Sequence, residues 1–386
     1  MKPLSKKKRI AIEVGIAVFA IAALSLLYSV YENNIDAYLA QAYQTQALSL
    51  GQVVSVENVE TSTDAYPVYN VVVQFLVGPN ANTTTTVTDQ PVSTSTINNY
   101  LKLVPGEKVL LAKDALGGFA GQPYYITDRF RLPVLLFIVL LFVAVAIFFG
   151  RMRGFTSIVG LGISIGVLGW YIIPQILNGA DPLTVCILGA AVIAIVSLYL
   201  AHGFNKRTSI AVLGTLISLT ISVILAVTFV SAARLIGLAT EESFALETSR
   251  NVVLNLRGIL LGGIIIGALG VLDDVTIGQS ATISELKQAN PNLDFGELYR
   301  RGMSVGREHI ASLINTLFLA YAGVALPIIL YLVAFQNGVP LWLSINGEPI
   351  AEEIVRTMIG SIGIVLAVPI TTILAAYFFG KHRRDN

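Results

Sequence analysis

Long apolar stretches are the feature that most constrains how this chain folds. A bilayer core of ~30 Å requires about 20 apolar residues for each crossing helix, and eight stretches of the 386-residue sequence meet this requirement. They are residues 10–30, 132–150, 155–177, 183–201, 209–233, 257–284, 310–335 and 353–379. Charged residues make up only 13% of the chain, whereas a soluble domain carries ~25%. The sequence therefore predicts an α-helical polytopic membrane protein with about eight transmembrane helices.

The first apolar stretch is interpreted as a retained membrane anchor. Basic residues 6–9 precede it, as they would in a secretory signal peptide. However, the apolar stretch from Ile10 to Val30 is longer than the ~7–15 residues of a signal peptide, and no convincing small-x-small cleavage site follows it. We therefore expect this segment to remain in the membrane.

Basic residues in the connections predict the orientation of the spans. If the N-terminus is inside, every short inside connection carries Lys or Arg, while the turn at 178–182 on the other side carries neither. Cytoplasmic loops are enriched in these residues, so both termini are predicted to be cytoplasmic. The predicted parts are a basic N-terminus (1–9), an anchor (10–30), an extracytoplasmic domain (31–131), a seven-helix membrane bundle (132–380) and a cytoplasmic tail (381–386).

The extracytoplasmic domain at 31–131 is predicted to be β-rich. Short β-branched runs occupy residues 52–59, 69–77, 83–92, 108–112 and 124–127, with Gly and Pro between several of them. This texture is typical of short strands joined by turns. Five such strands suit a small barrel or sandwich, and an OB-like fold is one candidate. The segment contains neither His nor Cys, and we find no catalytic arrangement in it.

Two adjacent acids interrupt the sixth apolar stretch. Asp273 and Asp274 follow a glycine-rich run, and Gln279 and Ser280 come shortly after them. At ~100° per residue, Asp273 and Ser280 share one helix face, while Asp274 points about 100° away. That second face carries Gly263, Gly267, Gly270 and Gly278. Small residues at this spacing let a neighbouring helix approach closely, so these four glycines are predicted to pack against another helix.

The seventh apolar stretch carries a polar face of its own. Glu308, Ser312 and Asn315 lie within about 60° of one another on a helix, with His309 and Thr316 on the flank. Because the sixth and seventh spans are antiparallel, their polar parts are predicted to meet in the cytoplasmic half of the bilayer.

The polar residues of these two spans suggest a transport function. An ionisable group at the bilayer centre costs about 2.5–3.5 kcal/mol, and such groups usually line an ion path, a proton relay or a cavity. We therefore predict a permease or a proton- or ion-coupled transporter. Asp273, Asp274 and Glu308 would bind the ion, and Gln279, Ser280 and Asn315 would orient ion or substrate. Two alternatives remain open: the acids lie at the water-accessible interface, or the protein is a non-catalytic subunit or scaffold of an envelope complex.

Enzymatic functions find little support in the sequence. Asp273, Glu308 and His309 have donor atoms suited to a divalent metal, which leaves a metal-dependent membrane enzyme as a minor alternative. The sequence lacks a P-loop, a Gly-x-Ser-x-Gly motif and a dinucleotide fingerprint, so no cofactor is expected. With a net charge of +1, the chain has no basic face for nucleic acid.

Three stretches of the chain resemble the YibE/F-like family of bacterial membrane proteins. They are residues 267–286, which contain Asp273 and Asp274, residues 306–323, which contain Glu308 and Asn315, and residues 353–372. The order of anchor, β-rich segment and membrane bundle agrees with this resemblance, which is closer to the longer YibE type. Where the family pattern has Arg-Asp, this chain has Arg307-Glu308, and the charge is kept. The resemblance implies a multi-pass protein of the bacterial cytoplasmic membrane, paired with a shorter YibF-like protein or with further copies of itself, and it implies no particular activity.

Overall fold

The computed structural model describes residues 48–59, 68–77, 80–89, 103–113, 124–240, 243–245, 254–334 and 340–380. The chain forms two compact units, residues 1–151 and residues 152–386, and each is described by itself. The predicted anchor at 10–30 and the predicted tail at 381–386 lie outside the described residues.

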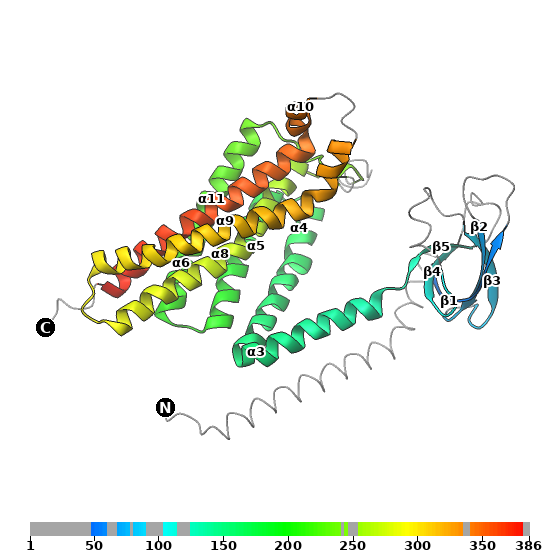
Figure 1. Ribbon diagram of the computed structural model, residues 1–386, viewed down its shortest axis with the longest axis horizontal. Coiled ribbons are helices and arrows are strands. Elements are labelled where there is room, and N and C mark those ends of the chain that lie inside the picture. The colour runs from blue at the N-terminus through cyan, green and yellow to red at the C-terminus, as the bar shows by residue number, and fades with distance from the viewer. Residues whose placement is uncertain are drawn as a thin grey trace, which may run out of the picture. The chain divides into compact units, whose positions relative to one another are not determined.

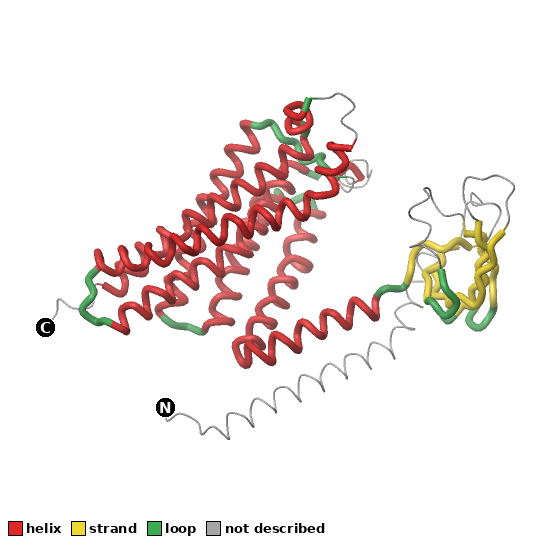
Figure 2. Tube along the Cα trace, viewed as in Figure 1, coloured by secondary structure: helices red, strands yellow, loops and turns green. Residues whose placement is uncertain are grey.

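Five antiparallel strands form one curled sheet in the first unit (Figure 2, yellow). The strands are β1 (Leu48–Val59), β2 (Val68–Phe75), β3 (Thr84–Asp89), β4 (Lys108–Lys113) and β5 (Tyr124–Arg129). Their order across the sheet is β3-β2-β1-β4-β5, so β1 is central and pairs with both β2 and β4. The two outermost strands, β3 and β5, also contact each other. The sheet therefore curls back on itself, and each predicted β-branched run coincides with one strand.

Apolar side chains fill the inner face of the curled sheet. Val71, Val73 and Phe75 alternate along β2, as the two-residue period of a strand requires, and all three are buried. Residues of the neighbouring strands complete this core, among them Val53, Val87, Val109 and Leu111. Gly51 of β1 faces the same interior, since a Cβ atom there would collide with the side chains of Val73 and Leu111. The position admits no larger side chain.

Helices make up nearly all the rest of the described chain (Figure 1). They are α3 (Leu132–Val167), a π-helical turn η1 (Leu168–Ile172), α4 (Ile173–Leu177), α5 (Pro182–His202), α6 (Lys206–Ala232), α8 (Leu256–Ala289), α9 (Phe295–Ala334), α10 (Leu341–Asn346) and α11 (Glu348–Gly380). Among the described residues, six helices are long and apolar enough to cross a membrane, with Leu132–Leu177 counted as one. These six helices cover the seven predicted apolar stretches from residue 132 onward, because the first helix contains two of them.

The helix that begins at Leu132 contains two of the predicted spans. Arg151 interrupts it with φ 55° and ψ −136°, a positive φ that residues other than glycine rarely adopt. At 1.5 Å per residue, residues 132–150 make about 28 Å of helix and residues 152–177 about 39 Å, so each part alone is long enough to cross a bilayer. The predicted total of eight spans is not confirmed, because one falls outside the described residues and two share this helix.

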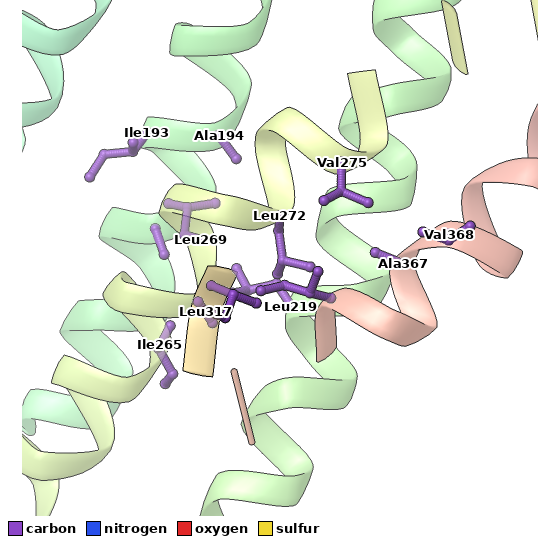
Figure 3. Close-up of a cluster of buried hydrophobic side chains, with 13 residues drawn as sticks. Ile193, Ala194, Leu219, Ile265, Leu269, Leu272, Val275, Leu317, Ala367 and Val368 are labelled. Carbon is purple, nitrogen blue, oxygen red and sulfur yellow. The ribbon is translucent and has the colours of Figure 1, made fainter. Parts of the chain in front are cut away.

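Helix α8 is the centre of the bundle and packs against α5, α6, α9 and α11. Figure 3 shows the buried cluster where these helices meet, with Leu219 of α6, Leu272 of α8, Leu317 of α9 and Val368 of α11 among its members. Lipid tails are as apolar as these side chains, so close packing and interhelical hydrogen bonds, rather than exclusion from water, hold such helices together.

Polar side chains fix where three of these helices begin. Asn205 caps α6 and Asn255 caps α8, each accepting a hydrogen bond from a backbone N–H of the first turn, at 3.0 and 2.9 Å. Asp181 caps α5 and accepts from both the N–H and the hydroxyl of Thr184, at 3.0 and 2.8 Å. These bonds favour the charged carboxylate, so they hold the pKa of Asp181 below its ordinary value.

The glycines that allow close helix contact are not the four predicted ones. Gly263, Gly267, Gly270 and Gly278 lie on the exposed face of α8, and a Cβ atom at three of them would meet nothing within 4 Å. Within the described residues no helix packs closely against these four positions, so the predicted contact stays a prediction. Close contacts occur instead where a Cβ would collide with a neighbour, as at Gly262 against α5, Gly363 against α6, and Gly302 and Gly306 of α9 against α8 and α11. The small-xxx-small spacing indicates a helix face without bulky side chains, but it does not identify the helix that packs against that face.

Candidate functional site

The positions of the polar residues are described relative to the two ends of the membrane bundle. The basic end is where α5 finishes and α6 begins with Lys206 and Arg207. There Arg207 pairs with Glu285 of α8 at 3.8 Å, and Lys206 donates to the carbonyl of Phe378 in α11 at 2.6 Å. The opposite end is where α11 begins at Glu348.

Asp273 is partly buried on α8, with one carboxylate oxygen inside the bundle. Its Oδ1 atom is buried and has no hydrogen-bond partner, and the hydroxyl of Thr215 on α6 is next to its carboxyl group. Ser280 marks the level of the basic end, because its hydroxyl donates to the Arg207 carbonyl at 2.8 Å. Asp273 precedes Ser280 by seven residues, about 10 Å of helix at 1.5 Å per residue. The acid therefore lies deeper than the basic residues by about a third of a ~30 Å bilayer core.

A row of hydroxyl groups continues from Asp273 along α6. The hydroxyl oxygens of Thr215 and Thr276 are 2.7 Å apart, and Ser218 and Ser222 follow on the same face of α6, both fully buried. Ser222 donates to the carbonyl of Ser218 at 3.1 Å, whereas the Ser218 hydroxyl has no hydrogen-bond partner. Buried polar atoms normally have a partner. The row therefore leaves one carboxylate oxygen and one hydroxyl that a bound ion or water would satisfy.

Gln279 and Ser280, which were predicted to orient an ion, hold helices together. The Gln279 side-chain amide donates to the Gly302 carbonyl of α9 at 2.9 Å and to the Thr372 hydroxyl of α11 at 2.7 Å. Gln279 is buried and so connects three helices through one side chain. Ser280 connects α8 with α6 through its bond to Arg207. Both side chains lie near Asp273 in sequence, but these donors are already used.

Asp274, the second acid of the pair, lies outside the bundle interior. It is exposed on α8, on the face that carries the four glycines, as the helical spacing predicted. Its charge acts on His202 at the end of α5, and the Nδ1 atom of His202 is buried without a hydrogen-bond partner. Adjacent in sequence, Asp273 and Asp274 therefore have different surroundings.

The four polar residues predicted on the seventh span do not face Asp273. They are Glu308, Ser312, Asn315 and Thr316, and all of them are exposed. Gly306 lies against Gln279 and Val368, and this contact fixes the packed face of α9. At ~100° per residue, Glu308 and Asn315 point about 180–200° away from Gly306. The predicted site is therefore divided: Asp273, Gln279 and Ser280 are on the packed side of α8, whereas Asp274 and the four residues of α9 face outward.

The three weak metal-ligand candidates are divided in the same way. His309 is exposed next to Glu308 on α9, whereas the free carboxylate oxygen of Asp273 is in the interior. Among the residues that the structure describes, no group of three or more His, Cys, Asp and Glu side chains is arranged to hold a metal ion. Asp273, Glu308 and His309 therefore do not form a common site.

Glu352 is a buried acid that the sequence analysis did not select. It lies near the beginning of α11, it is only 4% exposed, and its Oε1 atom has no hydrogen-bond partner. Two acids just before an apolar run are an ordinary sign of a helix start near the membrane surface, which explains why the predicted span began after it. One signal could have identified it: Glu352 is within about 20° of Gly363 on the helix, and Gly363 packs against Ser222.

A groove separates α9 from α11 nearer the opposite end. Its lining is almost entirely apolar and includes Phe318 and Ala325 of α9 and Ile354 and Met358 of α11. Glu353 also lines the groove, but its carboxylate is paired with Arg356 at 2.8 Å. The groove therefore offers apolar surface rather than a free charge.

Long apolar helices around a buried polar row define this chain as a multi-pass α-helical membrane protein. The YibE/F-like protein family matches residues 138–381, which is more than half of the chain and includes every helix from α5 to α11. The chain belongs to this family, as the resemblance of its sixth and seventh spans predicted. No curated protein and no solved structure matches it.

Proposed function

We propose that this protein is a permease or ion-coupled transporter in which Asp273 binds a proton or a small cation. The observation that carries this proposal is the buried and unpartnered carboxylate oxygen of Asp273 inside a bundle of apolar helices. An ionisable group at such a depth is costly, and membrane proteins that keep one commonly use it for ion or proton transfer.

The surroundings of Asp273 suit this role. A carboxylate exchanges a proton or a cation, and the hydroxyls of Thr215 and Thr276 supply further oxygen atoms beside it. Ser218 and Ser222 extend the polar row toward the opposite end. The sequence contains no nucleotide-binding motif, so an ion gradient is the energy source that this arrangement suggests.

The orientation follows from the positive-inside rule. We propose that the basic end of the bundle faces the cytoplasm of a bacterial cell, with both termini on that side and residues 31–131 outside. Lys206, Arg207, Arg300 and Arg301 would then lie at the inner membrane surface, where Lys and Arg are enriched. Asp273 would be nearer the cytoplasm than the outer surface.

Replacing Asp273 with Asn is expected to abolish ion flux. The amide has nearly the same shape as the carboxylate but neither binds a proton nor carries a charge at neutral pH. Purified protein is reconstituted in liposomes that contain a pH-sensitive dye, and proton flux is followed after a pH gradient and a membrane potential are imposed.

Asp294→Asn is the matched control for this experiment. Asp294 caps the start of α9 through its bond to the Glu297 N–H at 2.8 Å, and Asn caps helices equally well. This variant should keep wild-type flux. The proposal is contradicted if Asp273→Asn also keeps it, or if the wild-type protein moves no more protons than empty liposomes.

A second candidate function, a subunit or scaffold of an envelope complex, is favoured by the outward face of α9. Polar residues within membrane helices almost always face a protein interior or water, yet Glu308 and Asn315 face away from the bundle. We propose that a second copy of the chain covers this face. The curled sheet would then be the part presented to envelope partners, and its strand order and the contact between β3 and β5 favour an OB-like barrel over a sandwich.

Cysteine cross-linking tests this contact between copies. Asn315→Cys is expected to form a disulfide-linked dimer when membranes are oxidised, because Asn315 would lie near its counterpart in the second copy. Ile224→Cys, an exposed position on α6, should remain monomeric. If Asn315→Cys also stays monomeric, α9 is not the contact between copies.

A further inference from the structure

A second buried acid lies at the end of the bundle opposite the basic end. Glu352 of α11 is 96% removed from solvent, and its Oε1 atom has no hydrogen-bond partner. Ala351 and Val355, which flank it on α11, pack against an apolar cluster that includes Val230 of α6, Leu260 of α8 and Ile359 of α11. A charged carboxylate in such surroundings needs a compensating partner. The question is therefore what neutralises Glu352.

Glu352 has another acid close to it. Its carboxyl group is within hydrogen-bond reach of the Glu348 side chain, one helical turn earlier, and of the backbone N–H of Gly237. Glu348 in turn accepts from the backbone N–H groups of Ile236 and Gly237, at 2.7 and 3.1 Å. Gly237 has φ +89°, and a Cβ atom there would collide with the Leu256 carbonyl. A glycine is thus required to bring these N–H donors to Glu348.

This arrangement suits a proton better than a metal ion. Ionised carboxylates only accept hydrogen bonds, so a bond between two carboxyl groups requires a proton on one of them. The backbone N–H groups directed at Glu348 favour negative charge on that group, so the proton of the pair belongs on Glu352. Among the described residues, no group of three carboxylate, imidazole or thiol side chains that could ligate a metal is present.

Two basic side chains near this end, Arg356 and Arg257, are engaged elsewhere. Arg356, on the same helix, influences Glu352 electrostatically, but its guanidinium donates to Glu353 at 2.8 Å. Arg257 at the start of α8 donates to the Ser231 hydroxyl. The residues of α6 and α8 in the surrounding cluster are Ala, Val, Leu and Ile. Apart from the backbone N–H of Gly237 and the more distant charge of Arg356, a proton shared with Glu348 is the compensation that the described residues offer.

An apolar layer separates Glu352 from the hydroxyl row of α6. Ser222, at the end of that row, packs against Gly363 of α11, which is eleven residues after Glu352, or about 16 Å of helix. Ile359 of α11 lies within this interval, and Ile264 of α8 belongs to the same apolar cluster; each is 1% exposed. The bundle thus has an acid toward each end and an apolar barrier between them.

We propose that Glu352, with Glu348 as its hydrogen-bond partner, is a proton-binding site at the opposite end of the bundle from Asp273. This inference rests on the proposed transport function and names its coupling ion, the proton. Glu352 would exchange protons with the outer side and Asp273 with the cytoplasmic side. Opening of the apolar layer would connect the two sites.

Infrared spectroscopy of the purified full-length protein in lipid tests the site without depending on flux. A protonated carboxyl group has a C=O stretch distinct from that of a carboxylate. Because a protonated Asp273 would contribute to the same band, the comparison is made in the Asp273→Asn background. There we expect the band at neutral pH, its loss when Glu352→Gln is added, and its loss or shift when Glu348→Gln is added. Glu353→Gln is the matched control, because Glu353 is the adjacent acid but is paired with Arg356; it should keep the band. Proton flux in liposomes should fall to background in Glu352→Gln.

The outcomes separate this site from the proposed function. A band unchanged in both Glu352→Gln and Glu348→Gln overturns the proton site, whatever the flux of Asp273→Asn. If Glu352→Gln loses the band but keeps wild-type proton flux, the role of Glu352 in coupling is overturned. Loss of the band in Glu352→Gln, with wild-type flux in Asp273→Asn, supports the proton site and instead overturns the assigned role of Asp273. Because Glu348→Gln leaves the buried residue in place, it provides the same test if Glu352→Gln does not fold.

Discussion

Gly302→Leu is expected to prevent the bundle from assembling. A Cβ atom at position 302 would collide with the Ile283 side chain of α8 and lie 3.1 Å from Cγ2 of Thr372 in α11. A leucine would push α9 away from both helices and break the bond from Gln279 to the Gly302 carbonyl. Overpacking a filled site typically costs about 1–3 kcal/mol, and loss of the buried hydrogen bond adds about 1–3 kcal/mol. The variant should be aggregated or degraded when its size-exclusion profile in detergent is compared with that of the wild type.

Gly278→Leu is the control for this prediction. Gly278 lies on α8 only one residue from Gln279, but a Cβ atom there meets nothing within 4 Å. A leucine on this exposed face should leave the elution profile and thermal stability close to wild type. If the two variants behave alike, the contact between α8, α9 and α11 is not as close as the structure has it.

Gly51→Val is expected to unfold the curled sheet while leaving the helices intact. The new side chain would have to occupy space already filled by Val73 and Leu111, both 0% exposed. The two neighbouring strands pair with Gly51 through Phe75 and Val109, so β1 cannot shift without breaking both pairings. We expect a loss of several kcal/mol, at or above the ~1–3 kcal/mol usual for overpacking.

Limited proteolysis of the full chain in detergent measures this effect. The segment 48–129 should become sensitive in Gly51→Val, while a protected helical fragment of wild-type size remains. Thr86→Val, which adds an apolar side chain at an exposed position of β3, should keep the wild-type pattern. Loss of the helical fragment in Gly51→Val would show that the two units do not fold separately.

Sequence reasoning located the elements well because their signals are local. An apolar run of 20 residues is decisive within a membrane, and the β-branched runs between turns coincide with β1 to β5. It also placed Asp273 and Asp274 on different faces, because this depends only on the helical period.

The sequence pattern could not predict which helix packs against which face of its neighbour. Periodicity shows that Glu308 and Asn315 share a stripe, but the packed face of α9 is set by Gly306 meeting Val368, which is 62 residues later in the chain. In lipid, apolar residues occur on both buried and exposed faces, so hydrophobicity does not distinguish them. Glu352 was missed for the same reason, since its surroundings include the segment around Gly237, more than 100 residues earlier in the chain.

Helix α9 is held firmly at one end by the hydrogen bonds of Gln279 and packs more loosely at the other end, where it borders the groove. Near the basic end, Gln279 ties α9 to α8 and α11. Toward its other end, α9 contains Pro327, which removes a backbone hydrogen bond, and the groove lies between it and α11. Movement costs least where the fewest contacts must be broken. We therefore expect α9 to rotate as a rigid element about its contact with Gln279, with the largest displacement in the half that contains Pro327.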